Sequence, residues 1–122
     1  MKIMPLEDND LIIHQGGVLD RRYVVVDEED PDNTDLTGYT GECTVATASE
    51  DESGTVVLTP TVVVDTVNSI VQIYDDTLAD LRAVPAPANG HHVFGVYITG
   101  AGGDRWCVAY GRCRVVLEPA HA

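Results

Sequence analysis

Basic residues are scarce in this chain. Lysine occurs once, at Lys2, and seven lysines and arginines stand against 20 aspartates and glutamates, which gives a formal net charge of -13. A surface that neutralises phosphate groups needs a stripe of basic side chains, and an anionic membrane repels an acidic protein. We therefore expect neither nucleic acid nor a membrane surface among the partners.

The chain also lacks long apolar runs and a regular cysteine pattern. No window approaches the ~20 apolar residues of a membrane span. Residues 1–5 run directly into acidic residues, which is unlike a signal peptide. The three cysteines are an odd number without a CxxC pair, so they do not indicate a disulfide framework. We expect synthesis in a reducing cytoplasm, with a bond from Cys43 to Cys107 or to Cys113 left open.

What the chain does contain is β-branched residues in alternating patterns. Residues 39–48 and 105–117 alternate between two sets of side chains, as strands with one buried face do. The one helical signal lies near residues 76–82, where Leu78 and Leu81 have helical spacing and prolines follow. With turns every 8–12 residues, the pattern predicts an all-β fold, an antiparallel β-sandwich of about seven or eight strands.

A chain of 122 residues fits a single domain. We expect an N-terminal arm over residues 1–9, the sandwich over 10–119 and a tail over 120–122. Acidic turns are predicted at 27–35 and 49–54, and Pro60 marks an edge, a bulge or a break between two strands.

Residues that could support chemistry are few. The turn from Asp27 to Asp35 offers carboxylates but lacks the glycine and the closing glutamate of an EF-hand, so a solvated turn is favoured over a cation site, which stays open. His91 and His92 are adjacent and would point to opposite faces of a strand. No serine lies in a nucleophile elbow, and no cysteine precedes a helix. We expect no enzyme activity, no cofactor and no metal.

The last predicted strand carries the candidate interaction residues. Its small apolar side chains, from Cys107 to Leu117 at every second position, are expected to face the core, and the intervening residues to face outward. The outward set includes Trp106, Tyr110, Arg112 and Arg114. Aromatic residues together with arginine are typical of protein contact surfaces. The alternative is an outer face on which the arginines pair with nearby carboxylates.

Several short motifs resemble a known family. In chain order they are Gln15 and Gly16, a hydrophobic strand at 23–26, the acidic turn, Asp-Leu-Thr-Gly-Tyr at 35–39, an isoleucine strand at 70–74, Thr-Leu-Ala-Asp-Leu at 77–81, and a closing hairpin over 93–98 and 105–117. This arrangement resembles the small immunoglobulin-like β-sandwich domain of tailed-bacteriophage virion proteins, as found in minor tail proteins and at the N-terminus of upper baseplate proteins.

The resemblance implies a non-enzymatic virion structural protein, most of all a minor tail or baseplate component that assembles with other phage structural proteins in several symmetric copies. A capsid decoration protein of the phage head is the alternative within this class. A carbohydrate- or calcium-binding sandwich, suggested by Trp106 and Tyr110, is the alternative from another class. In the motif at 35–39, Asp35 is expected to bond turn amides, Leu36 to plug the sandwich and Gly38 to adopt a conformation that favours glycine.

Overall fold

The structure is a computed structural model, and it describes residues 1–8, 10–48, 54–88 and 90–118. Within these residues the chain forms nine strands and one short helix. In chain order they are β1 (Leu6–Glu7), β2 (Leu11–His14), β3 (Leu19–Val24), β4 (Thr40–Thr47), β5 (Val56–Leu58), β6 (Thr61–Asp65), β7 (Ile70–Asp75), α1 (Leu78–Ala83), β8 (His92–Thr99) and β9 (Arg105–Val116).

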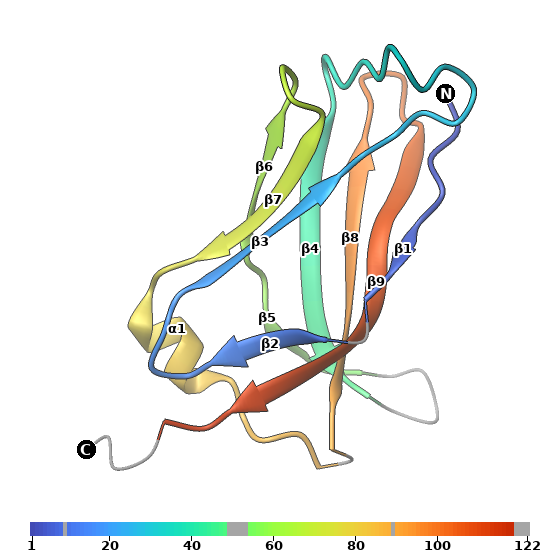
Figure 1. Ribbon diagram of the computed structural model, residues 1–122. Helices are drawn as coiled ribbons and strands as arrows, with labels where there is room; N and C mark the ends of the chain where they lie inside the picture. Colours follow the sequence, from blue (N-terminus) through green and yellow to red (C-terminus); the bar gives the residue numbers. More distant parts are fainter. Residues whose placement is uncertain (9, 49–53, 89, 119–122) are drawn as a thin grey trace.

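The strands form two sheets that pack as a sandwich, which confirms the predicted fold class. The larger sheet has the order β1-β9-β8-β4-β5, with β2 also paired to β9, and the smaller has the order β3-β7-β6 (Figure 1). The pairing is not antiparallel throughout, because β1 and β2 both run parallel to β9. No helix in the described part of the chain is long and apolar enough to cross a membrane.

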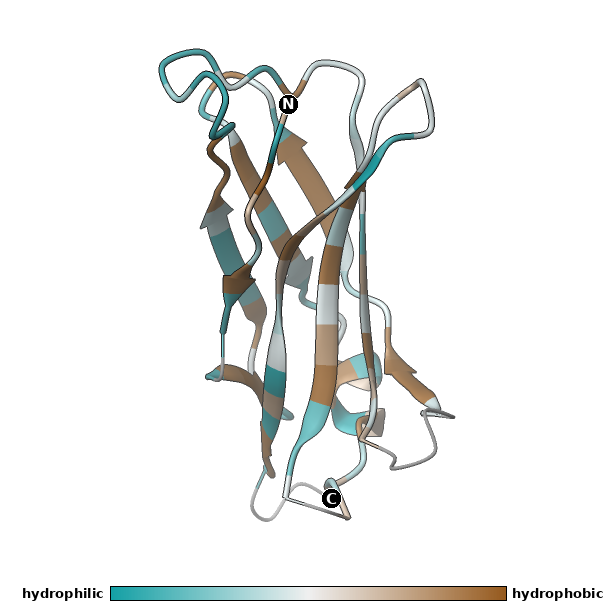
Figure 2. Cartoon of the chain, turned by 90° about the vertical axis from the view of Figure 1, so that its right-hand side faces the viewer, coloured by the Kyte–Doolittle hydropathy of each residue, from teal (hydrophilic) through white to brown (hydrophobic). Residues whose placement is uncertain are grey.

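The core follows from the alternation of the strands. Hydrophobic and hydrophilic segments alternate along them (Figure 2), and Val71 and Ile73 of β7 and Val96 and Ile98 of β8 are fully buried members of one core cluster. Such β-branched residues pack well on a pleated surface. Pro60 separates β5 from β6, which belong to different sheets, so of the edge, bulge or break left open at this proline, the break between two strands is what forms.

The predicted helical turn forms at Leu78–Ala83, close to the expected 76–82. The helix follows Thr77, which makes no side-chain capping bond, and the Asp75 carboxylate accepts a hydrogen bond from the Thr77 N–H at 2.8 Å. The second acidic turn falls largely on residues 49–53, which lie outside the described residues.

The first residues of the chain, predicted to be an arm, lie against the sandwich. Ile3 is 6% exposed and forms an antiparallel bridge with Asp27. The chain then crosses to the other sheet, where β1 pairs with β9. Ile3 is the buried apolar residue that holds this segment, and a single buried position in so short a stretch gives no periodic pattern. Residue 9 and the predicted tail at 120–122 lie outside the described residues.

Gly111 is the point on β9 where β1 gives way to β2. The Asp8 N–H donates to the Tyr110 carbonyl at 2.9 Å, so the backbone of Asp8 lies directly against Gly111. A Cβ at Gly111 would lie 2.1 Å from the Asp8 carbonyl oxygen, and the φ of Gly111 is +154°. The Asp8 carboxylate accepts a bond from the Tyr23 hydroxyl and pairs with Arg21, both at 3.1 Å. Only glycine allows this crossing.

Replacing Gly111 should therefore detach the N-terminal strands. We expect Gly111→Ala to lower the free energy of unfolding by more than ~1 kcal/mol, because a Cβ would collide with backbone. Denaturant unfolding measures the loss. Gly102→Ala is the control, since the nearest atom to its added Cβ is 4.0 Å away. Equal stability of the two variants would contradict this account of the crossing.

Gln15 links three chain segments at the other end of the sandwich. Its side chain is 7% exposed, with Nε2 donating to the Val84 carbonyl at 2.9 Å and Oε1 accepting from the Glu118 N–H at 3.1 Å. A Cβ at Gly16 would lie 2.9 Å from the Glu118 side chain, which also pairs with Arg82 at 2.7 Å. The Gln-Gly pair thus ties the end of α1 and the end of β9 to β2.

Removing only the polar atoms of Gln15 tests this role. Gln15→Met keeps the volume but leaves two backbone groups without partners, so the free energy of unfolding should fall by about 2–4 kcal/mol. The matched change Gln72→Met loses only a surface bond to Asp20 and should cost within about 1 kcal/mol. A similar cost for both, measured by urea unfolding, would show that Gln15 is not a structural link.

Candidate docking face

The register of β4, β8 and β9 defines the solvent side of the larger sheet. Residues opposite one another in a sheet point to the same side, and here they form four rows across the three strands. We call this side the outer face; its rows are Thr40–Thr99–Arg105, Glu42–Tyr97–Cys107, Thr44–Gly95–Tyr110 and Ala46–Val93–Arg112.

A bulge in β9 changes which residues belong to the outer face. Val96 pairs with Ala109 and Tyr97 with Cys107, so Val108 is an extra residue between them. An extra residue reverses the alternation on one side of the bulge. Val108 is accordingly buried, and Trp106 lies opposite buried Ile98 and packs against the core. The expected outward position of Trp106 and Val108, and the inward position of Cys107, are therefore wrong.

Tyr97 lies flat on the outer face. A Cβ at Gly95 would lie 2.7 Å from the Tyr97 ring, so the absence of a side chain at Gly95 makes room for it. The Arg105 guanidinium stacks on the other side of the ring, 3.9 Å from its centroid. Glu42 holds that guanidinium, at 2.7 Å from Nη2 and 3.1 Å from Nε. Exposed ion pairs contribute little to stability, so this cluster mainly fixes the shape and charge of the surface.

The other predicted interaction residues lie beside this cluster or beyond it along β9. Tyr110 is 45% exposed and lies opposite Gly95. Arg112 is exposed and has no ion-pair partner among the described residues, whereas Arg114 pairs with Asp10 at 3.8 Å. Three of the seven basic residues of the chain, counting Arg105, thus lie on β9. Of these three, Arg105 and Arg114 are paired with carboxylates, so Arg112 contributes the unneutralised positive charge of the strand.

Trp106 has a structural role at the end of the sheet. Its Nε1 donates to Asp104 at 3.3 Å, and the Tyr39 hydroxyl donates to the same carboxylate in a short bond. The Tyr39 bond is the main reason that the pKa of Asp104 is lowered. These bonds join the hairpin loop before β9 to the loop before β4. A tryptophan held in this way offers little surface for a sugar ring.

The carboxylates of the first acidic turn bond to the turn itself. Asp27 accepts the N–H groups of Lys2 and Glu29, both at 3.0 Å, and the bond from Lys2 is the main cause of its lowered pKa. Asp35 accepts the Thr37 N–H at 2.9 Å, as expected. In the described parts of the chain, no three histidine, cysteine or acidic side chains gather as metal ligands would. The carboxylates of Asp27 and Asp35 thus stabilise the backbone of this turn.

His92 is a feature that sequence reasoning missed. The residue is 1% exposed, Nε2 lies 2.8 Å from the Pro85 carbonyl, and Nδ1 has no hydrogen-bond partner in the described part of the chain. Because a carbonyl oxygen only accepts, Nε2 is the donor in this contact. His92 thereby fastens the proline-rich segment after α1 to the sheet.

The three cysteines are free thiols. Burial raises the pKa of Cys43 and of Cys113 to about 12. Cys107 is half-buried on the outer face, and burial raises its pKa as well. A nucleophilic cysteine needs a lowered pKa, so none of the three is activated.

Alkylation should therefore distinguish the thiols. At about pH 8 we expect iodoacetamide to modify Cys107 first, and Cys43 and Cys113 about a thousandfold more slowly than a free thiol, because so little thiolate forms at their raised pKa. Mass spectrometry after proteolysis locates the label. Urea should expose all three, and Cys107→Ser should leave the native protein almost unlabelled. Rapid native labelling of Cys43 would contradict the packing described here.

Comparisons with known proteins add no relative: no protein-family description matches the chain, and no curated protein matches its sequence significantly.

Proposed function

We propose that this chain is a non-enzymatic structural protein of a tailed-phage virion, most of all a minor tail or baseplate component. The virion assignment depends on the sequence motifs at 15–16, 35–39 and 77–81. The proposal that it acts by docking depends on the outer face, where a fixed tyrosine–arginine cluster lies beside exposed Tyr110 and Arg112, the latter without an ion-pair partner in the described ranges. Aromatic and arginine side chains of this kind contribute much of the binding energy at protein interfaces.

Charge supports a docking role for the same face. A molecule of net charge -13 stays soluble and repels its own copies at long range. On this face Glu42 neutralises Arg105, whereas Arg112 has no ion-pair partner among the described residues, so an acidic group of a partner would meet an unneutralised arginine here. The partners would be other phage structural proteins, and the location the assembled particle.

The two alternatives remain distinguishable from this proposal. A capsid decoration protein would use the same face on a head shell. The carbohydrate- or calcium-binding alternative receives less support, because Trp106 packs against the core and Asp27 and Asp35 bond to their own turn.

The location can be tested on particles of the phage that encodes the chain. Mass spectrometry of gradient-purified virions should find its peptides in fixed stoichiometry with other structural proteins. After disruption, recovery with tails would support the minor tail or baseplate assignment, and recovery with heads would favour the decoration alternative. Absence from purified particles would overturn the virion proposal.

Substitutions on the outer face, and at Arg114 just beyond it on β9, should weaken assembly more than stability. In a complementation assay we expect Tyr110→Ala, Arg112→Glu or Arg114→Glu to reduce incorporation into particles at least about tenfold, since truncated interface anchors commonly cost over ~1.4 kcal/mol of binding. Melting temperatures should change little, because these side chains are exposed. Val63→Glu, on the exposed side of β6, is the control. Incorporation that falls only in step with stability would count against the docking role of this face.

A further inference from the structure

The edge strand β3 of the smaller sheet has unused backbone hydrogen-bonding groups. The Val25 N–H donates to the Ser69 carbonyl at 2.8 Å, just beyond the end of β3. In an antiparallel pair the bonded residues alternate, so from the register of β3 with β7, Tyr23 and Arg21 also bond toward β7. Asp20, Arg22 and Val24 therefore direct their N–H and C=O groups away from β7. In the described part of the chain no other strand pairs with this edge.

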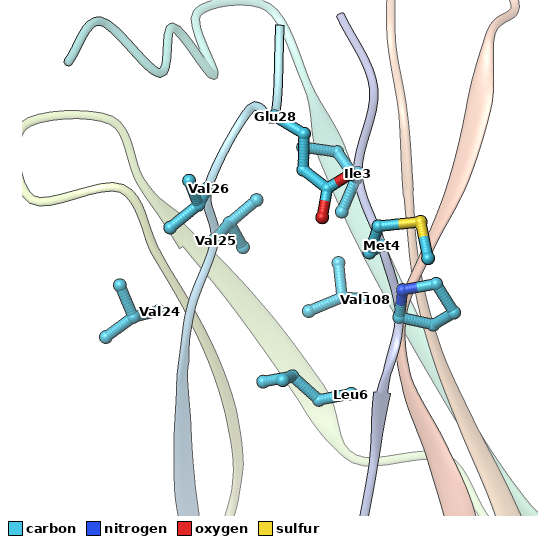
Figure 3. A pocket seen from close by; sticks show the side chains of 9 residues that line it. Ile3, Met4, Leu6, Val24, Val25, Val26, Glu28 and Val108 are labelled. Carbon is cyan, nitrogen blue, oxygen red and sulfur yellow. The ribbon is translucent and has the colours of Figure 1, made fainter. Parts of the chain in front are cut away.

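An apolar groove lies beside this free edge. Its cavity of about 230 Å³ is lined by residues 3–6 on one side, by residues 24–26 and Glu28 on the other, and by Val108. Figure 3 shows Leu6 and Val25 pointing into the gap between the two chain segments. Leu6, which forms part of the groove wall, is 48% exposed. Val24 and Val26 are exposed as well, on the opposite side of β3 from Val25 (Figure 3). An exposed apolar wall beside a cavity commonly marks an interaction site.

The two chain segments that flank the groove are bonded together at one end and separate toward the other. At the closed end Ile3 bridges to Asp27, and the Glu28 N–H donates to the Lys2 carbonyl at 2.8 Å. From Ile3 the chain crosses to β9 and leaves the position beside β3 vacant. A strand added there would satisfy the free backbone groups of β3, and every second side chain would enter the groove. A small ligand would use only the cavity and leave the edge unpaired.

The charges around the groove select the occupant. Glu28 lines it, and the acidic turn from Asp27 continues from its closed end with Glu29, Asp30 and Asp32. A second copy of this chain would bring another net charge of -13 to the same place. A segment with lysine or arginine at the end nearest the turn would instead gain attraction.

We propose that the groove between β1 and β3 binds an extended segment of another protein, apolar at alternate positions and basic at one end, which adds a strand to β3. This site is separate from the outer face and does not depend on the virion assignment. Any such donor would be held by backbone bonds for affinity and by the groove for the choice of side chains.

A synthetic peptide of about eight residues, the length of a long strand, tests the proposal. It alternates valine and threonine and ends in two lysines. Hydrogen exchange of the full chain, followed by NMR, should show fast exchange at Arg22 and Val24 and slow exchange at Tyr23 and Val25. Adding the peptide should protect Arg22 and Val24. A peptide of equal length with prolines at the pairing positions should not bind, and glutamate in place of lysine should weaken binding at least about tenfold.

Two variants locate the binding. Val24→Pro removes an N–H that has no native partner, and Leu6→Asp removes an exposed wall of the groove; each should weaken peptide binding at least about tenfold. Val56→Asp, at an exposed position on β5, should bind as the unchanged protein does. If Val24→Pro unfolds the chain, the Leu6→Asp variant and the proline-containing peptide still test whether a strand binds in the groove.

Three results would overturn the proposal. The first is that the proline-containing peptide still binds and that the lysine peptide binds the Leu6→Asp and Val24→Pro variants as tightly as the unchanged protein. The second is no binding of the lysine peptide. The third is a concentration-dependent dimer of the free chain, seen by sedimentation and abolished by Leu6→Asp, which would assign the groove to a second copy.

Discussion

The register of β9 is the constraint on which the rest of the structure depends. β9 pairs with β8 on one side and with β1 and β2 on the other, so it is the strand that joins the N-terminal segment to the sheet. The extra residue at Val108 decides which side chains reach solvent, and Gly111 decides where the N-terminal segment passes from β1 to β2. A slip of one residue in β9 would exchange its two faces. Core, outer face and N-terminal crossing would all be lost together.

Buried polar groups fix the position of the connecting segments, which have no alternating pattern of apolar and polar residues. Gln15 ties α1 and the end of β9 to β2, Asp8 anchors Tyr23 and Arg21, and Asp27 holds the first residues beside the end of β3. Each satisfies N–H, C=O or O–H groups that would otherwise be buried without a partner, which is costly. The hydrophobic core favours a two-layer packing, and these few bonds select how the connecting segments cross it.

Sequence reasoning succeeded where one local rule decides the structure. Leu36 is fully buried, Gly38 has a φ of +83°, and Asp35 bonds Thr37, as the motif at 35–39 predicts. It failed on Trp106 because a bulge leaves no mark in an alternating pattern; the adjacent pair Val108–Ala109, both buried, is visible only once β8 is paired. The groove was missed for a related reason. Ile3 and Leu6 lie in a stretch too short to show a periodic pattern, and only the tertiary crossing shows that they line a gap.

The two candidate sites use different physics and suit different partners. The outer face offers side chains on a fully paired part of the sheet, so binding there depends on shape and on arginine and tyrosine contacts. The groove offers backbone groups at an edge, so binding there depends on an extended segment with little requirement for sequence beyond alternation and charge. Exposed edges invite unwanted pairing, and natural proteins protect them with charge. Here Asp20 and Arg22 pair with each other on β3, and the overall negative charge discourages self-pairing. The charge on the β3 edge disfavours pairing with a second copy of this chain, while the groove beside it remains apolar. The site therefore favours a strand from another protein over a homodimer.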